Sequence, residues 1–286
     1  MNDKSDGRVV LITGASSGIG KACAQHLHGM GLKVYGTSRK GHSPWEASAE
    51  PSPSDHSDSF EMLGIDVSND DAVQGGIRYI LEKEGRLDIV INNAGISIGG
   101  ALEDVSMEEC RGVFETNLYG IIRVCQAVIP TMRKQKAGYI INVSSLGGQI
   151  GMPFDSIYCA SKHAVEGLTE TLRMEIKQFG IKTVLIEPGD IDTGASSRMP
   201  RAERAQTNPV YMDILNKVYA ASIENEDEGS PPETVALLVE RIINTASPRL
   251  RYKVGPTFQK LMIPLKRILP HGTFERIIMK NYNMIS

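Results

Sequence analysis

The chain has 286 residues, of which 41% are hydrophobic and 23% charged, and its formal net charge at pH 7 is -3. A chain of this length can bury a sizeable core, and this composition is typical of a soluble globular protein, with one α/β domain as the simplest expectation. Because basic residues are not in excess overall, the composition argues against a nucleic-acid-binding protein.

The start of the chain and its cysteines bear on location. Residues 1–8 are polar and lack the apolar stretch of a signal peptide, and no apolar run approaches the roughly 18 residues that cross a bilayer. Cys23, Cys110, Cys125 and Cys159 lie in or beside segments of helical periodicity and lack the spacing of metal ligands. We therefore expect a cytoplasmic protein with buried, reduced thiols and no metal site.

Short apolar runs alternate with longer segments of helical period. The runs are Val9–Ile12, Val34–Tyr35, Met62–Ile65, Ile89–Ile91, Tyr139–Ile141 and Val184–Ile186. This alternation predicts βαβ units, and hence an α/β fold whose parallel sheet is covered by helices on both faces. Small or polar clusters follow most of the runs. Ligands bind at the carboxyl ends of parallel strands, so we expect these clusters to converge on one site.

A glycine-rich turn, Thr13–Gly20, follows the first predicted strand and opens a helical segment over residues 21–30. Such a turn lets the backbone approach a pyrophosphate closely, and the helix start supplies unpaired N–H groups and a favourable dipole. The predicted dinucleotide-binding residues here are Gly14, Ser16, Ser17, Gly18, Ile19 and Gly20. The glycine spacing differs from the common G-x-G-x-x-G pattern, so a tight turn without a ligand is the alternative.

The second predicted strand, residues 33–37, ends in Ser38 and Arg39, where a site specific for NAD would place an acidic residue. A neutral Ser followed by Arg favours the 2′-phosphate of NADP(H) through charge-assisted hydrogen bonds. The alternative is a solvated surface Arg39.

Two stretches interrupt the alternation. Residues 42–59 are rich in Ser, Pro, Asp and Glu, and they are predicted to form a solvated surface loop because they cannot bury an apolar face. Residues 191–230 mix Pro, Gly and charge around a weakly helical middle, and they are predicted to form a flexible flap.

Two Tyr-x-x-x-Lys pairs occur, Tyr79/Lys83 and Tyr158/Lys162, and helical spacing would place both members of each pair on one face. Tyr79/Lys83 lies in a charged segment with no strand-end donor beside it, so we interpret it as a chance match. Tyr158/Lys162 differs because Ser145 stands at the end of the strand predicted over residues 139–143.

Carbonyl reduction needs a proton donor for the forming alkoxide, a cation that makes this donor more acidic, and a second donor on the same oxygen. Tyr158, Lys162 and Ser145 are the predicted groups, in that order. A lysine cation about 4 Å from the phenol is expected to lower its pKa by about three units before desolvation takes some back. The Lys162 ammonium is also expected to hold the nicotinamide ribose.

As a set, these motifs resemble those of the short-chain dehydrogenase/reductase family over about residues 7–255. The segments that carry the resemblance are Thr13–Gly20, Asn92–Gly95, Asn117, Ser145, Tyr158–Lys162 and Pro188–Thr193. The resemblance implies a single-domain, doubly wound Rossmann-type sheet of seven strands flanked by helices, and a homodimer or homotetramer.

The resemblance also implies roles for further residues. Asn117 would organise a proton-relay water. The implied cofactor contacts are Asp66 at the adenine, Asn93, Ala94 and Gly95 around the adenosine, and Pro188, Gly189, Ile191 and Thr193 near the nicotinamide, whose amide Ile191 and Thr193 would flank.

Each of these residues has a plainer alternative. Asn117 could bond the backbone within its helix, and Asp66 could cap the helix that starts near residues 68–70. The segment Asn92–Gly95 could be only a turn after a strand, and Thr193 could make ordinary loop hydrogen bonds.

The predicted function is NADP(H)-dependent interconversion of a ketone or aldehyde and an alcohol. Segments Met152–Phe154 and Tyr252–Pro256 are loosely similar to the family branch that acts on hydroxysteroids and retinoids, which suggests a bulky apolar substrate. A non-catalytic NADP(H)-binding regulator is the alternative, but it would not need an intact set of Tyr, Lys, Ser and Asn.

Residues 256–286 form a basic amphipathic tail beyond the predicted catalytic domain of residues 1–255. Pro264 and Pro270 are expected to break the tail into short helices. Such pieces can lie on an anionic membrane, as a membrane-peripheral protein would use them, but docking on the enzyme's own substrate mouth or on a partner subunit is favoured.

Overall fold

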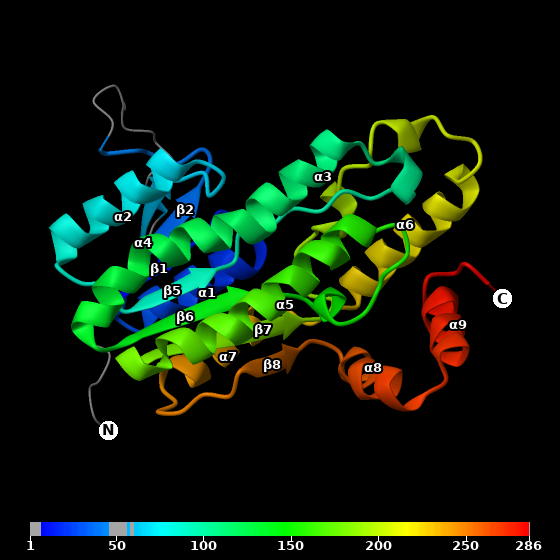
Figure 1. Ribbon diagram of the computed structural model, residues 1–286. Helices are drawn as coiled ribbons and strands as arrows, with labels where there is room; N and C mark the ends of the chain where they lie inside the picture. Colours follow the sequence, from blue (N-terminus) through cyan, green and yellow to red (C-terminus); the bar gives the residue numbers. More distant parts are fainter. Residues whose placement is uncertain (1–6, 46–55, 58–59, 286) are drawn as a thin grey trace.

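The computed structural model describes residues 7–45, 56–57 and 60–285, and its centre is one sheet in the order β3-β4-β2-β1-β5-β6-β7-β8 (Figure 1). All neighbouring strands are parallel except the pair β3 and β4. The strands are β1 (Val9–Ile12), β2 (Lys33–Ser38), β3 (His56–Ser57), β4 (Phe60–Gly64), β5 (Ile89–Asn92), β6 (Gly138–Val143), β7 (Ile181–Pro188) and β8 (Arg251–Val254).

The predicted doubly wound, seven-stranded parallel sheet in a single domain is confirmed, with the two-residue β3 added at one edge. The six apolar runs correspond to β1, β2, β4, β5, β6 and β7. Strand β8 lacks this signal because it is an edge strand in which Arg251 and Lys253 interrupt the apolar residues.

Helices cover both faces of the sheet. The helices of the described residues are α1 (Gly18–Gly29), α2 (Asp70–Glu84), α3 (Met107–Phe114), α4 (Gly120–Gln135), α5 (Ser156–Ile176), α6 (Met212–Asp227), α7 (Glu233–Ile243), α8 (Thr257–Ile268) and α9 (His271–Asn281). Short 3-10 turns lie at Leu102–Asp104 (η1), Leu146–Gly148 (η3), Lys177–Phe179 (η4), Ser196–Arg198 (η5) and Arg204–Gln206 (η6), and a π-helical turn (η2) spans Glu115–Tyr119.

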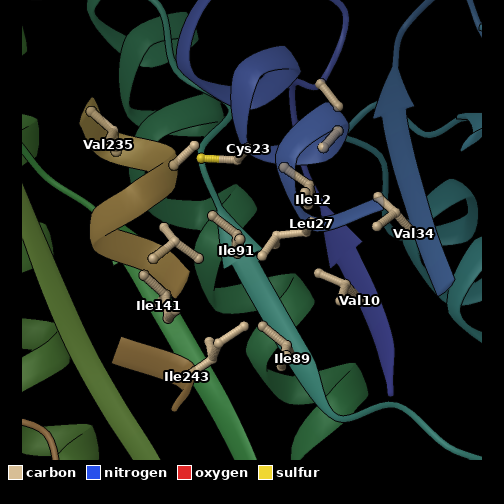
Figure 2. Close-up of a cluster of buried hydrophobic side chains, with 14 of the residues drawn as sticks. Val10, Ile12, Cys23, Leu27, Val34, Ile89, Ile91, Ile141, Val235 and Ile243 are labelled. Carbon is tan, nitrogen blue, oxygen red and sulfur yellow. The ribbon is translucent and has the colours of Figure 1, made fainter. Parts of the chain in front are cut away.

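Alternation along the strands divides the core into two layers. Val10 and Ile12 of β1 face the layer of α1 and α7 and belong to one core cluster with Leu27 of α1 and Val235 of α7 (Figure 2). The intervening residues of β1 face the opposite layer, which contains α2, α4 and α5. Side chains alternate across a strand, so a strand that is buried on both faces must be apolar throughout, as β1 is.

The chain reverses its direction across the sheet at β1, whose two neighbours are β2 and β5. The loops that follow β1 and β5 therefore leave the sheet on opposite faces and open a crevice at the carboxyl ends of the strands. This topology brings the glycine-rich turn and Asn92–Gly95 to one place.

Part of the segment 42–59 differs from the solvated loop that the sequence predicts, although residues 46–55 and 58–59 lie outside the described part. Trp45 packs against Tyr79 of α2, with ring centroids 6.1 Å apart. A methyl group on Gly75 would lie 2.5 Å from the Trp45 ring, so the indole rests on the glycine. The start of this segment therefore packs against α2 through the Trp45 indole. The many polar residues around Trp45 in the sequence give no sign of this contact.

The segment 191–230 contains regular structure where the sequence suggests a flap. Helix α6 spans 16 residues and buries Leu215, Val218 and Tyr219. The backbone of Ile191 also bridges to Ser230, so the two ends of the segment lie side by side. The apolar residues of α6 are spaced as one buried face, although polar neighbours dilute the signal.

The tail forms α8 and α9, which extend from the end of β8 (Figure 1). The expected break at Pro264 is wrong, because this proline lies inside α8, where the buried Met262 and Ile263 hold the helix against the body. Pro270 does separate the two helices, as the residue before α9. No helix among the described residues is long and apolar enough to cross a membrane.

The contact of Trp45 leads to a spectroscopic prediction. Trp45 is the only tryptophan, and its half-buried ring should emit at shorter wavelength in the native protein than in denaturant. Gly75→Ala should shift the native emission to longer wavelength by displacing the ring, whereas Gly112→Ala, whose added methyl meets nothing within 4 Å, should not. Equal emission maxima of native and denatured protein would mean that the segment is solvated, as its composition suggests.

Candidate active site

A cleft of about 940 Å³ lies at the carboxyl ends of the strands. All the site residues predicted from the sequence line it except Gly20 and Asn117, which lie behind its wall. The cleft is long: one end contains the turn after β1 and the end of β2, and the other contains residues of α8 and α9.

Glycines shape the turn at the first end. Gly14 and Gly18 have φ values of +68° and +53°, in the left-handed region that favours glycine. A methyl group on Gly20 would lie 2.3 Å from the carbonyl oxygen of Gly14, so Gly20 serves to pack the helix against the turn. No side chain caps the first residues of α1 at Ser17, so their N–H groups remain available to an anion.

Asn93 ties the turn to the end of β5. Its side-chain amide donates to the carbonyl oxygens of Thr13 and Gly14, at 3.0 and 3.1 Å. In return the Thr13 hydroxyl oxygen accepts from the backbone N–H groups of Asn93 and Ala94, at 3.0 Å each. Asn92–Gly95 is thus more than a turn after a strand, and Thr13 is a positioning residue that its place in the motif alone did not reveal.

Asp66 follows β4 and lines the cleft. Its carboxylate accepts from the backbone N–H and the hydroxyl of Ser68, at 2.9 and 2.6 Å. The helix cap of α2 is Asn69, whose side chain accepts from the N–H of Ala72 at 2.9 Å. The alternative reading of Asp66 as the cap is therefore wrong.

Asn117 is fully buried on the π-helical turn between α3 and α4. Its amide oxygen accepts from the N–H of Ile96, and its amide nitrogen donates to the Ile96 carbonyl, both at 2.8 Å. The same nitrogen donates to the Ser161 hydroxyl of α5 at 3.0 Å. Asn117 therefore joins the loop after β5 to α5, which excludes the alternative of a bond within its own helix.

Tyr158 and Lys162 lie one turn apart on α5, beside the end of β6. The Lys162 ammonium is buried and donates to the carbonyl oxygen of Val143 at 2.8 Å. It lies 5.6 Å from the centre of the Tyr158 ring. Ser145, just past β6, accepts from the N–H of Gly147 at 3.0 Å. A methyl group on Gly147 would lie 3.3 Å from the Ser145 hydroxyl oxygen and 3.4 Å from the Tyr158 ring, so the two side chains are neighbours.

Burial dominates the electrostatics of this group. It raises the pKa of Tyr158, as the neighbouring Asp155 and Asp190 do, while the Ser145 hydroxyl opposes the rise. Burial also lowers the pKa of Lys162 to about 8. The expected acidification of the phenol by Lys162 is therefore absent from this structure, because taking the phenolate out of water disfavours it more than its surroundings favour it.

Tyr79 and Lys83 are confirmed as lying elsewhere. Both project from α2 to Glu61, whose carboxylate oxygens accept from the Tyr79 hydroxyl at 2.8 Å and the Lys83 ammonium at 2.7 Å. Neither residue lines the cleft.

Thr193 lines the cleft, but its hydroxyl donates to the Glu226 carboxylate at 2.7 Å, as the alternative of loop hydrogen bonding expects. Glu226 is buried and also accepts from the N–H groups of Ala195 and Ser196. It holds the loop after β7 in place from 33 residues away in the sequence. No sequence motif indicated this role.

The far end of the cleft has two carboxyl groups that the sequence analysis missed. Asp155, at the start of α5, accepts from the Ser97 hydroxyl at 2.5 Å, and burial raises its pKa to about 6. Asp190 accepts from the amide of Gln259 on α8, and burial raises its pKa too. The negative charges of Asp155 and Asp190 both raise the pKa of Tyr158, so both carboxyl groups lie near its phenol. Their positions beside the Tyr and Pro-Gly motifs were the available signal.

Helices α8 and α9 close this end. Met262, Ile263 and Phe274 pack with Leu146 and Ile150 of the segment after β6, which is the docking on the enzyme's own mouth that the sequence favours. Phe258, Gln259, Met262, Ile278, Asn281 and Tyr282 line the cleft.

A doubly wound sheet with a glycine-rich turn at its switch point, and a Tyr/Lys/Ser group farther along the same cleft, define a dinucleotide-binding oxidoreductase. A family model described as short chain dehydrogenase matches residues 8–204. The chain belongs to the short-chain dehydrogenase/reductase family.

Individual relatives agree with this assignment. The chain is 40% identical to 3-ketodihydrosphingosine reductase of Bacteroides thetaiotaomicron, over 94% of this chain and 95% of that protein. It is 32% identical to retinol dehydrogenase 8 of Bos taurus, over 93% and 87% of the two chains. A solved short-chain dehydrogenase from Streptomyces avermitilis superposes with a TM-score of 0.77 at 27% identity, covering 98% of this chain and 97% of the other.

Solved structures similar to this chain contain either nicotinamide cofactor. A Burkholderia phymatum short-chain dehydrogenase/reductase in complex with NAD has a TM-score of 0.74 at 28% identity, over 96% of both chains. A metagenomic short-chain oxidoreductase in complex with NADP has a TM-score of 0.64 at 25% identity, over 87% of this chain and 97% of the other. The choice between the two cofactors therefore depends on this chain's own residues.

Proposed function

We propose that this protein is an NADP(H)-dependent reductase that interconverts a lipid-like ketone or aldehyde and its alcohol. The observation that carries the proposal is that Tyr158, Ser145 and Lys162 meet at the end of β6, in the same cleft as the glycine-rich turn. A non-catalytic NADP(H)-binding regulator would not require these three side chains to lie together.

The bound nicotinamide supplies or accepts the hydride. Ser145 and Tyr158 both present hydroxyl groups to a carbonyl oxygen placed between them, and Tyr158 gives its proton to the forming alkoxide. Lys162, anchored on Val143, holds the ribose of the cofactor and keeps positive charge beside the phenol. Asn117 joins α5 to the loop after β5, and we assign it the role of organising a water that relays protons from solvent.

The end of β2 supports NADP(H). Arg39 lines the cleft and is exposed, with its charge at the position where a 2′-phosphate would lie. Lys40, the next residue, does not line the cleft. No acidic residue stands at this strand end to bind a free ribose hydroxyl.

Apolar side chains in the far half of the cleft support a bulky, lipid-like substrate. Leu146, Ile150, Met152, Phe258 and Met262 line it. The first compound to try is 3-ketodihydrosphingosine, after the relative that is 40% identical. This compound joins a long alkyl chain to an amino ketone, and Asp155 and Asp190 offer carboxylates for the ammonium group beside the carbonyl.

The expected homodimer or homotetramer and the cytoplasmic location stay predictions.

Tyr158→Phe should abolish turnover of any ketone that the wild type reduces, because the variant lacks the proton donor. Its NADPH dissociation constant should stay within a few-fold, since the ring still packs. Tyr79→Phe is the matched control, at the Tyr/Lys pair outside the cleft, and it should reduce ketones at the wild-type rate. NADPH consumption measures both. Near-normal turnover by Tyr158→Phe would reject the assignment and favour the regulator.

Arg39→Ala should weaken NADPH binding by about ten- to a hundredfold, because a charge-assisted hydrogen bond to the 2′-phosphate is worth about 1.5–3 kcal/mol. NADH binding should change little, because NADH lacks that phosphate. Lys40→Ala, the neighbouring cation outside the cleft, should leave both dissociation constants near their wild-type values. Equal weakening of both cofactors in Arg39→Ala, or a wild type that prefers NADH, would contradict the assignment.

The raised pKa of Asp155 gives a pH dependence. Only the ionised carboxylate attracts an ammonium group, so the KM of an amino ketone should rise as pH falls through about 6. Asp155→Asn keeps an acceptor for Ser97 but has no charge, so the rise in KM near pH 6 should shrink to what Asp190 contributes. Its preference for the amino ketone over the same ketone without the amine, as a ratio of kcat/KM, should fall about tenfold. A preference that Asp155→Asn retains would rule out this recognition.

A further inference from the structure

Helix α8 has two apolar sides. Met262 and Ile263 are buried against the body, each 4% exposed. On another side Phe258, Leu261 and Ile268 follow each other at helical spacing and are 54%, 53% and 76% exposed. We call these three residues the outer stripe. They are large apolar side chains that the enzyme's own core does not use.

Basic residues are frequent on the outer stripe's helix, α8, and on the helix that follows it. Helices α8 and α9 carry five lysines and arginines, which are Lys260, Lys266, Arg267, Arg276 and Lys280, and one acidic residue, Glu275. The chain as a whole has a net charge of -3, so positive charge is concentrated in this tail. Arg267, Arg276 and Lys280 are exposed.

The outer stripe borders the mouth of the cleft. Phe258 belongs to both, because it lines the cleft and is more than half exposed. Ile278 of α9 and Tyr282, the residue after α9, line the cleft as well. A surface that contacts the outer stripe therefore lies directly at the entrance for substrate.

We propose that the outer stripe and its basic residues dock the enzyme on the interface of an anionic membrane, so that the cleft opens toward the lipid. An exposed apolar stripe on a pair of helices rich in Lys and Arg matches such an interface, in which acyl chains lie beneath negative headgroups. A second copy fits less well, because a two-fold contact between identical surfaces would place these like charges against each other. The docking goes beyond the proposed reaction and does not require it.

Vesicle flotation tests the docking without turnover. The wild type should float with vesicles of phosphatidylcholine mixed with phosphatidylserine, float much less with pure phosphatidylcholine, and be released in part by about 1 M salt. Removing residues 256–286 would uncover Leu146 and Ile150, so point substitutions are the cleaner test.

Leu261→Asp and Ile268→Asp should each weaken binding to the anionic vesicles by about tenfold or more, because each removes a membrane-facing apolar side chain and adds a negative charge. Met174→Asp is the matched control, since Met174 is 69% exposed on α5, outside the tail. Arg267→Gln and Lys280→Gln should weaken binding less and reduce its dependence on salt. None of these residues lines the cleft, so reduction of a short, soluble ketone should be unchanged.

A wild type that stays unbound with anionic vesicles would overturn the docking, as would Leu261→Asp and Ile268→Asp variants that float like Met174→Asp. Sedimentation in which wild type dimerises and Ile268→Asp does not, without vesicle binding by either, would instead assign the stripe to a second copy. Thermal melts of each variant separate lost docking from lost folding. An enzyme that docks but reduces no lipid-like ketone would reject the proposed function and leave the docking intact.

Discussion

The structure of the site depends on a buried lysine. Lys162 donates to the last carbonyl of β6, and this bond fixes α5 against the strand end so that Tyr158, one turn earlier, meets Ser145. Burying an ammonium is costly, and the lowered pKa of Lys162, about 8, reflects that cost. Asn117 secures α5 from the other side through Ser161. The proposed proton donor is therefore held by polar groups that are themselves buried.

The loops around this centre are held by side chains that hydrogen-bond to the protein's own backbone. Asn93 and Thr13 join the ends of β1 and β5, and Glu226 holds the loop after β7. Each satisfies backbone groups that a strand or helix would otherwise pair. A rigid cofactor end is thus combined with a substrate end closed by α8 and α9, whose contacts are mainly apolar.

Much of the fold and of the site could be predicted from the sequence, because it follows from patterns of neighbouring residues. Apolar runs buried on both faces identified six strands, and the turn after β1 needed glycine at two left-handed positions. Strand β8 and the contact of Trp45 could not be predicted. Strand β8 lies at the edge of the sheet and is partly polar, and the contact of Trp45 depends on Gly75 of α2, which leaves room for the indole.

The sequence by itself determined the α/β class, the family and many of the residues that line the cleft, because these follow from periodicity and from motifs with local geometry. The sequence favoured Tyr158 over Tyr79 because Ser145 stands at a strand end near it, and the tertiary structure confirmed this choice, since only Tyr158 lines the cleft. The tertiary structure alone brought Asp155, Asp190 and Glu226 to the site and divided α8 into a buried and an exposed apolar side. These outcomes depend on which distant segments pack together, and no local pattern encodes that.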